Sequence, residues 1–290
     1  MLLPAALAAG FVLPGTPVPL HDLAVPCQDM RYPALAGPWA VGCGPGGEVD
    51  RAVNLETGAR VRLDQGLLSP ALAEGQLFST EHQGAWLTLD GDQATARPEL
   101  ARQPEARHAP PAFDGQHTVI FGADYVAVGE PDTRLSTRYP TRPAGWYAPA
   151  LAWPWVTWVA RGEDGREEVW AVDTSRAKGP QRLSRPGSDG RHVVGSGEHL
   201  AWVETDGVVR LNTRTGSRQV TRADAGFSAP ISLWRDVVCW EDRSGADLDV
   251  RCSDGLEAAG PGDQQAPSRW GPYLMYRSAG AVWVTMAEAP

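Results

Sequence analysis

The chain has 290 residues, of which 42% are hydrophobic and 21% charged, and its formal net charge is −9. A chain of this length can form two average domains or one large all-β domain. The negative charge argues against a nucleic-acid partner, because phosphate binding needs a dense surface of Lys and Arg. No interior stretch is apolar over the roughly 18 residues that predict a membrane-spanning helix.

Residues 1–15 are apolar and carry no charged side chain. They resemble the hydrophobic region of a secretory signal, and Ala6–Ala8 is a small-residue pattern typical of a cleavage site. A buried N-terminal segment is the alternative. We expect residues 1–15 to be a signal-like or disordered segment of a periplasmic or secreted protein.

The next segment, Thr16–Leu23 (TPVPLHDL), is expected to be a short strand without a partner nearby in the sequence. Pro17 and Pro19 have no backbone N–H group, so the segment suits the edge of a sheet, where one side needs no donors. The repeats that follow decide which sheet it joins.

From residue 33 onward the sequence repeats at intervals of about 40 residues. In Pro149–Ser184, for example, an apolar lead-in precedes the strand-like pieces WVTWVA, EVWAVD and PQRLS. With the lead-in counted as the first piece of each unit, an aromatic residue near the end of the second piece marks the last five units: Phe121, Trp158, Trp202, Trp240 and Tyr276. The seven units are residues 33–66, 67–103, 104–141, 142–185, 186–225, 226–264 and 265–290.

Four strands per unit at this period predict the blades of a β-propeller. A two-sheet sandwich also has alternating strands, but it needs no fixed period. The last unit has only three strands, Ser268–Trp270, Tyr273–Tyr276 and Ala281–Met286, so we expect Thr16–Leu23 to be its outer strand. The prediction is a single all-β domain over residues 16–290, a seven-bladed β-propeller of four-stranded antiparallel blades closed by an N-terminal strand.

Two pairs of cysteines are disulfide candidates. Cys239 and Cys252 flank the hairpin CWEDRSGADLDVRC, whose centre places them opposite each other on antiparallel strands, within disulfide reach. Two buried reduced thiols are the alternative. Cys27 and Cys43 are candidates for a second pair, although connectivity cannot be deduced from sequence. Disulfides would agree with export, and the C-x-x-C spacing of zinc sites is absent.

The units LWRDVVCWEDRSGADLDVRCSDG and SGEHLAWVETDGVVRLNTRTGSRQVT resemble blades of TolB-like, WD-repeat-related propellers. The resemblance covers the chain from about Pro33 onward and is strongest between Trp146 and Gly255. It implies a periplasmic, secreted or surface-associated protein that binds other macromolecules.

Four residues are candidates for binding. Trp146 and Tyr147 lie in the loop that enters an inner strand, and exposed Trp and Tyr are frequent interface anchors. Packing between blades is the alternative for them. His108 and His192 fall in or near segments that lead into inner strands, where side chains can face the central channel. Ordinary surface or hydrogen-bonded histidines are the alternative.

The sequence lacks a recognisable catalytic or cofactor motif. Gly42–Gly47 matches G-x-G-x-x-G, but a strand rather than a helix follows it, so no dinucleotide is expected. Asp242, Asp247 and Asp249 have a calcium-like spacing, which we interpret as solvated turn chemistry. No catalytic residue, metal site or cofactor is predicted.

The function predicted is that of an exported, monomeric, non-catalytic scaffold that binds a protein or another macromolecule. Fold does not imply function, so two alternatives stay open. One is a propeller enzyme, a lyase or hydrolase with its site in the central channel, and the other is a structural surface module.

Overall fold

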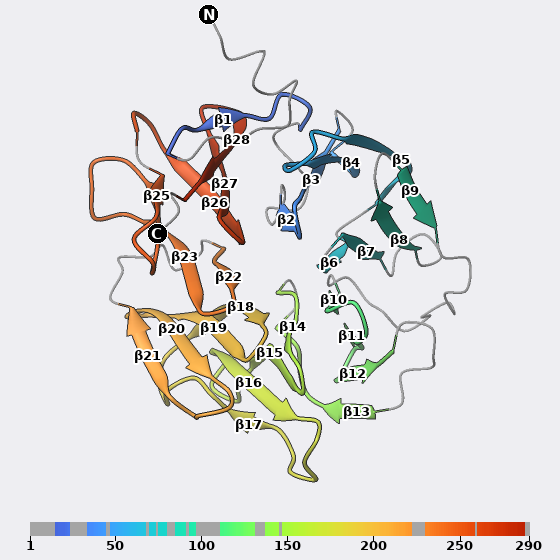
Figure 1. Ribbon diagram of the computed structural model, residues 1–290. Coiled ribbons are helices and arrows are strands. Elements are labelled where there is room, and N and C mark those ends of the chain that lie inside the picture. The colour runs from blue at the N-terminus through green and yellow to red at the C-terminus, as the bar shows by residue number, and fades with distance from the viewer. Residues whose placement is uncertain are drawn as a thin grey trace, which may run out of the picture.

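The computed structural model describes residues 15–23, 34–44, 47–67, 70–73, 75–79, 85–90, 93–96, 111–130, 137–144, 147–221, 230–258 and 260–287. These residues form seven antiparallel sheets of four strands each, arranged in a ring around a central axis (Figure 1). The predicted seven-bladed propeller is confirmed. The described part of the chain contains no helix with the length and apolar character that a membrane span requires.

Each of the first six blades is built from consecutive strands, with the first strand at the hub and the last at the rim (Figure 1). Blades one to three consist of β2 (Ala34–Ala36), β3 (Trp39–Cys43), β4 (Val49–Asn54) and β5 (Arg60–Leu67); β6 (Ala71–Ala73), β7 (Gln76–Ser79), β8 (Ala85–Asp90) and β9 (Gln93–Ala96); and β10 (Ala112–Phe113), β11 (Thr118–Phe121), β12 (Tyr125–Gly129) and β13 (Thr137–Pro140). Blades four to six consist of β14 (Ala150–Ala152), β15 (Trp155–Arg161), β16 (Glu167–Asp173) and β17 (Gln181–Arg182); β18 (Gly190–Ser196), β19 (His199–Glu204), β20 (Gly207–Asn212) and β21 (Arg218–Thr221); and β22 (Ser232–Trp234), β23 (Val237–Asp242), β24 (Asp249–Cys252) and β25 (Glu257–Ala258).

The seventh blade combines the two ends of the chain. Its strands β26 (Gln264–Trp270), β27 (Tyr273–Ser278) and β28 (Ala281–Met286) are followed in the sheet by β1 (Val18–Pro19). Backbone hydrogen bonds beyond the two-residue strand lengthen the contact, from Gly15 N–H to the Met286 carbonyl (2.9 Å) and from Leu20 N–H to the Val282 carbonyl (2.8 Å). The predicted closure is confirmed, with a shorter regular strand than Thr16–Leu23, because Pro17 and Pro19 supply no donors.

Apolar residues of the N-terminal segment also pack into the seam between the last and first blades. Val18, Leu20 and Leu23 are buried in one cluster with Met275, Val282 and Val284 of the seventh blade and Ala40 and Val53 of the first. Burial of apolar surface is the main favourable term in folding. The closing segment therefore stabilises the ring by packing as well as by hydrogen bonds.

The hub, defined as the ring of seven inner strands, is tied together by serine side chains. The Oγ atoms of Ser196, Ser232 and Ser268 each accept a backbone N–H bond of 2.8 Å from the next blade. The donors are Arg235, Arg269 and Leu35, respectively. These bonds link the fifth blade to the sixth, the sixth to the seventh, and the seventh to the first.

The hairpin of the sixth blade carries the predicted disulfide. Cys239 on β23 and Cys252 on β24 are paired directly in the strand register and are joined by an S–S bond. Cys43 is disulfide-bonded as well, and Cys27, its predicted partner, lies outside the described residues. A disulfide fits an oxidising compartment outside the cytosol.

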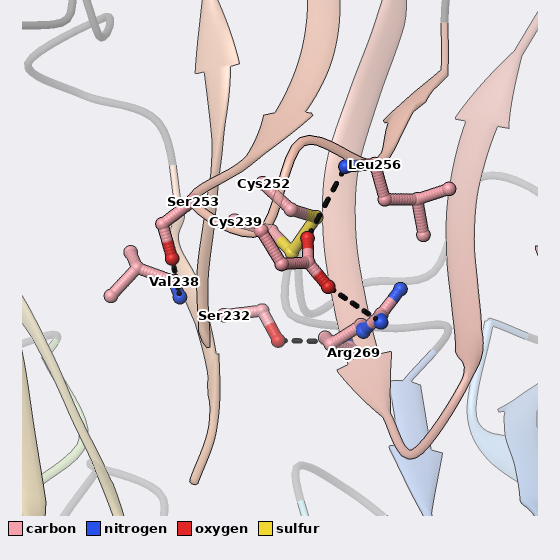
Figure 2. Close-up of a disulfide and its surroundings, with 8 residues drawn as sticks. Ser232, Val238, Cys239, Cys252, Ser253, Leu256 and Arg269 are labelled. Atoms are coloured by element: carbon pink, nitrogen blue, oxygen red, sulfur yellow. Dashed lines mark hydrogen bonds and ion pairs between the residues drawn. A yellow bond between two sulfur atoms is a disulfide. The ribbon is translucent and has the colours of Figure 1, made fainter. Parts of the chain in front are cut away.

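Next to this disulfide, an ion pair spans the seam between the sixth and seventh blades (Figure 2). Arg269 Nη2 on β26 donates to Asp254 Oδ2 at 2.9 Å, and the Arg269 side chain is only 3% exposed. Burial lowers the pKa of Arg269, and the negative charge of Asp254 opposes that effect. A buried guanidinium needs such a partner, because an unpaired buried charge is strongly destabilising.

Candidate functional site

Two of the four predicted binding residues meet at the seam between the fourth and fifth blades. Tyr147 lies just before β14, and His192 lies in β18, the inner strand of the next blade. Their rings make an edge-to-face contact with centroids 5.1 Å apart and planes at 87°. The other two candidates, Trp146 and His108, lie outside the described residues.

A β-bulge gives His192 its position. The register between β18 and β19 shifts between Arg191 and Val194, and His192 adopts a positive φ of 50°. Bulges re-aim side chains at the ends of strands, and histidine enters the left-handed region more readily than most residues. The bulge therefore places the imidazole against the loop that enters the fourth blade.

Charged residues complete this group, which we call the Tyr147 cluster: Tyr147, Glu167, Arg191 and His192. Arg191 on β18 forms an ion pair with Glu167, the first residue of β16. The backbone N–H of Glu167 donates to Asp189 Oδ1 (3.1 Å) in the connection between the two blades. The cluster is thus held by strands of two blades and by the segment that joins them.

The Tyr147 phenol has a raised pKa in this cluster. Burial raises the pKa of Tyr147, and the negative charge of Glu167 raises it further, against a smaller opposing effect of Arg191. The phenol therefore keeps its proton at neutral pH and can donate a hydrogen bond. Arg191 forms an ion pair with Glu167, and both side chains hydrogen-bond with Tyr147, so the cluster is a network of paired polar groups beside the His192 imidazole.

The sequence did not single out Arg191 or Glu167. Arg191 precedes His192 at the start of the same inner strand, which could have drawn attention to it. Glu167 stands in the charged stretch GEDGREE, where alternation alone does not show which carboxylate faces the seam. Trp158, from the aromatic stretch around Tyr147, is buried as a core residue and donates from Nε1 to Thr141 Oγ1 (3.0 Å).

A second group with a raised pKa, the Glu241 carboxyl, lies at the seam between the sixth and seventh blades. Glu241 on β23 is 6% exposed, and one of its oxygens accepts the backbone N–H of Ala266 at 2.9 Å. Ala266 occupies a bulge in β26 with φ of 52°, as His192 does in β18. Burial raises the pKa of Glu241, while this hydrogen bond and the charges of Arg243 and Arg277 lower it.

The raised pKa of Glu241 predicts a pH-dependent cost to stability. Above 4.5, the value for an exposed glutamate, the unfolded chain releases a proton that the folded protein still holds, so stability falls as the pH rises through the folded pKa. Glu241→Gln removes this dependence and still accepts the Ala266 N–H bond. We expect the free energy of unfolding of Glu241→Gln, relative to that of the wild type, to increase as the pH rises from acid to neutral.

Urea unfolding at a series of pH values measures this difference. Glu163→Gln, an exposed substitution, is the control and should follow the wild type across the range. If the two proteins differed in free energy of unfolding by the same amount at all pH values, the result would contradict a raised pKa for Glu241.

The acidic turn of the sixth blade makes bonds within its own hairpin and to the segment that leads into the seventh blade. Asp242 accepts the Ser244 N–H bond (2.9 Å) and pairs with Arg251 (2.9 Å), and Asp247 accepts the Gly262 N–H bond (3.3 Å). Within the described ranges, no group of three or more His, Cys, Asp or Glu side chains is arranged to hold a metal ion.

Comparison with known proteins identifies the fold. No protein-family model and no curated protein matches the chain. The acylaminoacyl peptidase of Pyrococcus horikoshii is similar at 8% identity and a TM-score of 0.62, over 87% of this chain and 50% of that one. The β-propeller domain of the Trilobed protease from Pyrococcus furiosus is similar at 9% identity and a TM-score of 0.60, over 88% and 93%.

TolB from Acinetobacter baumannii also matches, at 14% identity and a TM-score of 0.44, over 82% of this chain and 59% of that one. Sequence identities this low support a shared fold and do not indicate a shared activity. With its seven four-stranded blades and its similarity to these solved propellers, the chain is a seven-bladed β-propeller.

Proposed function

We propose that the protein is an exported, non-catalytic scaffold that binds a macromolecular partner at the end of the hub where the Tyr147 cluster lies. The contact between Tyr147 and His192 carries this proposal, because it joins an aromatic anchor to polar groups across two blades. Tyrosine serves well as an interface anchor, since it offers a large apolar ring and a hydroxyl at small entropic cost. Trp146, the preceding residue in the sequence, is proposed as a second anchor for this partner.

The disulfide of the sixth blade supports export, because such bonds persist in oxidising compartments. We propose a periplasmic or secreted location and a monomeric state. The partner is a protein or another macromolecule, without a cofactor or metal.

Affinity capture tests the proposal. Immobilised wild-type protein is expected to retain a macromolecule from the periplasm or medium of its own organism, and Tyr147→Ala to retain about tenfold less, as the loss of an interface anchor predicts. Val220→Ala, a truncation of an exposed side chain on β21, is the matched control and should retain as much as the wild type. Recovery of no macromolecule, or equal recovery by Tyr147→Ala, would contradict the proposal.

One observation favours an enzyme as the second candidate. A carboxyl group whose pKa is raised by burial, such as Glu241, holds its proton to a higher pH than an exposed glutamate does and can serve as a general acid. An enzyme of this kind would turn over a small substrate such as a sugar or lactone. Glu241→Gln would abolish that turnover, whereas Tyr147→Ala would leave it intact.

A further inference from the structure

A histidine of the fifth blade contacts the turn that joins the two outer strands of that blade. His199 is the first residue of β19, and the strand register places it directly opposite Asn212, the last residue of β20. Asn212 leads into the turn to β21, the outermost strand of the blade (Figure 1). The Nδ2 atom of Asn212 lies 3.1 Å from His199 Nε2, within hydrogen-bond distance.

The turn decides which of these two side chains is the donor. Asn212 Oδ1 accepts the backbone N–H groups of Arg214 and Thr215, each at 3.0 Å, which fixes the amide oxygen on the side of the turn. The amide nitrogen of Asn212 therefore faces the imidazole, and an amide nitrogen can only donate. His199 Nε2 has to accept this bond, which it can do only without a proton. The hydrogen bond thus belongs to the neutral imidazole.

The charged groups around His199 come from three elements of the fold. Arg210 lies on the same face of β20 as Asn212, two residues before it. Glu198 directly precedes His199, and Asp236 lies in the turn after β22 of the sixth blade. Burial lowers the pKa of His199, and the positive charge of Arg210 lowers it further. The negative charges of Asp236 and Glu198 oppose this effect without reversing it.

Protonation of His199 removes the hydrogen bond and replaces it with repulsion. His199 Nε2 then carries a hydrogen that faces the amide hydrogens of Asn212, and the imidazolium charge adds to that of Arg210. An exposed histidine of the unfolded chain takes up its proton near pH 6.5, whereas the folded protein does so at lower pH. The stability that this contact contributes is therefore complete above 6.5 and is lost as the pH falls through the folded pKa.

The first blade contains the same turn without a histidine. Asn54 Oδ1 accepts the N–H groups of Glu56 (2.9 Å) and Thr57 (3.0 Å), as Asn212 Oδ1 does with its own turn. Both turns have the sequence Asn-x-x-Thr-Gly. The residue opposite Asn54 is Trp39, whose indole does not take up a proton in this pH range. The two turns therefore differ in whether the opposing side chain can become charged.

The strand that follows the turn of the fifth blade takes part in the seam to the fourth blade. Arg218, the first residue of β21, donates from Nη2 to Oε1 of the buried Glu204 at 2.7 Å. Arg185, which follows β17 of the fourth blade, donates from Nε to the other carboxylate oxygen of Glu204 at 2.7 Å. A change in β21 therefore reaches a buried carboxylate between the two blades.

We propose that His199 and Asn212 form a pH-dependent latch, which holds the β20–β21 turn at neutral pH and releases it when His199 takes up a proton. Release loosens β21 at the rim of the fifth blade, together with its ion pair at the seam. The latch and His192 belong to opposite ends of β18, and the latch does not rest on the binding role proposed for the Tyr147 cluster.

Amide hydrogen exchange measured by NMR from about pH 8 to about pH 5 tests the latch. Protection factors, which correct for the intrinsic pH dependence of exchange, are expected to fall about fivefold for Arg214 and Thr215 as His199 becomes protonated, because one hydrogen bond is lost. The protection factors of Glu56 and Thr57 in the first blade should stay constant. The imidazole resonances of His199 should titrate with a midpoint below 6.5.

Three variants separate the latch from a general effect of acid. His199→Gln offers an oxygen that can accept from Asn212 at every pH, so the turn should stay protected across the range. His199→Lys carries its charge throughout and should give low protection at every pH. His21→Gln, which removes an exposed histidine, is the matched control and should respond like the wild type. Constant protection of the turn in the wild type, or a wild-type response in His199→Gln, would overturn the proposal.

Discussion

Gly195→Ala is expected to lower the free energy of unfolding by about 3 kcal/mol, because the inner strands of the fourth and fifth blades touch at this glycine. A Cβ atom at Gly195 would lie 2.0 Å from the carbonyl oxygen of Leu151 and 2.4 Å from its carbonyl carbon. Both are backbone atoms of β14, so no flexible side chain can move aside.

Chemical denaturation of the wild type and two glycine variants measures this effect. Gly179→Ala is the matched control, since its added Cβ would meet no atom within 4 Å. It is expected to unfold at nearly the same denaturant concentration as the wild type. Equal midpoints for Gly195→Ala and Gly179→Ala would show that the hub has room at this point, against the geometry described.

Leu20→Asp is expected to destabilise the protein by about 4 kcal/mol, as the loss of a buried leucine combined with the burial of a carboxylate predicts. Leu20 is 3% exposed and packs in the cluster at the seam between the last and first blades. Once the closing segment is released, β28 becomes an unpaired edge, which promotes association between molecules.

Thermal unfolding and size-exclusion chromatography report the two effects of Leu20→Asp. Thr16→Asp introduces the same charge at an exposed position of the same segment and should leave the stability and the elution volume of the wild type unchanged. A Leu20→Asp protein that elutes at the same volume and unfolds at the same temperature as the wild type would show that the N-terminal segment contributes little to the ring.

The architecture was predictable because each blade is a local unit that repeats along the chain. The aromatic residues of the second strands, such as Trp158 and Trp202, are buried anchors, and their recurrence at intervals of about 40 residues shows their positions. The closing strand was predictable by elimination, since the last unit lacks a strand and Thr16–Leu23 lacks a sheet. The disulfide followed from the symmetry of one hairpin.

The sites were less predictable because they depend on contacts between blades. β18 and β26 have seven residues, whereas β14 and β22 have three, and the bulges in the two longer inner strands leave no mark in the hydrophobic pattern. The contact between Tyr147 and His192 depends on one of these bulges.

Hydrogen–deuterium exchange at the amides of Gly15 and Leu20 would examine the joining of the termini without altering the molecule. If the ring is clasped as described, Leu20 N–H, bonded to the Val282 carbonyl, exchanges only when the whole protein unfolds, as slowly as amides of β27. Exchange of Leu20 at the rate of an unstructured peptide, while β27 stays protected, would mean that the propeller holds together without its N-terminal strand.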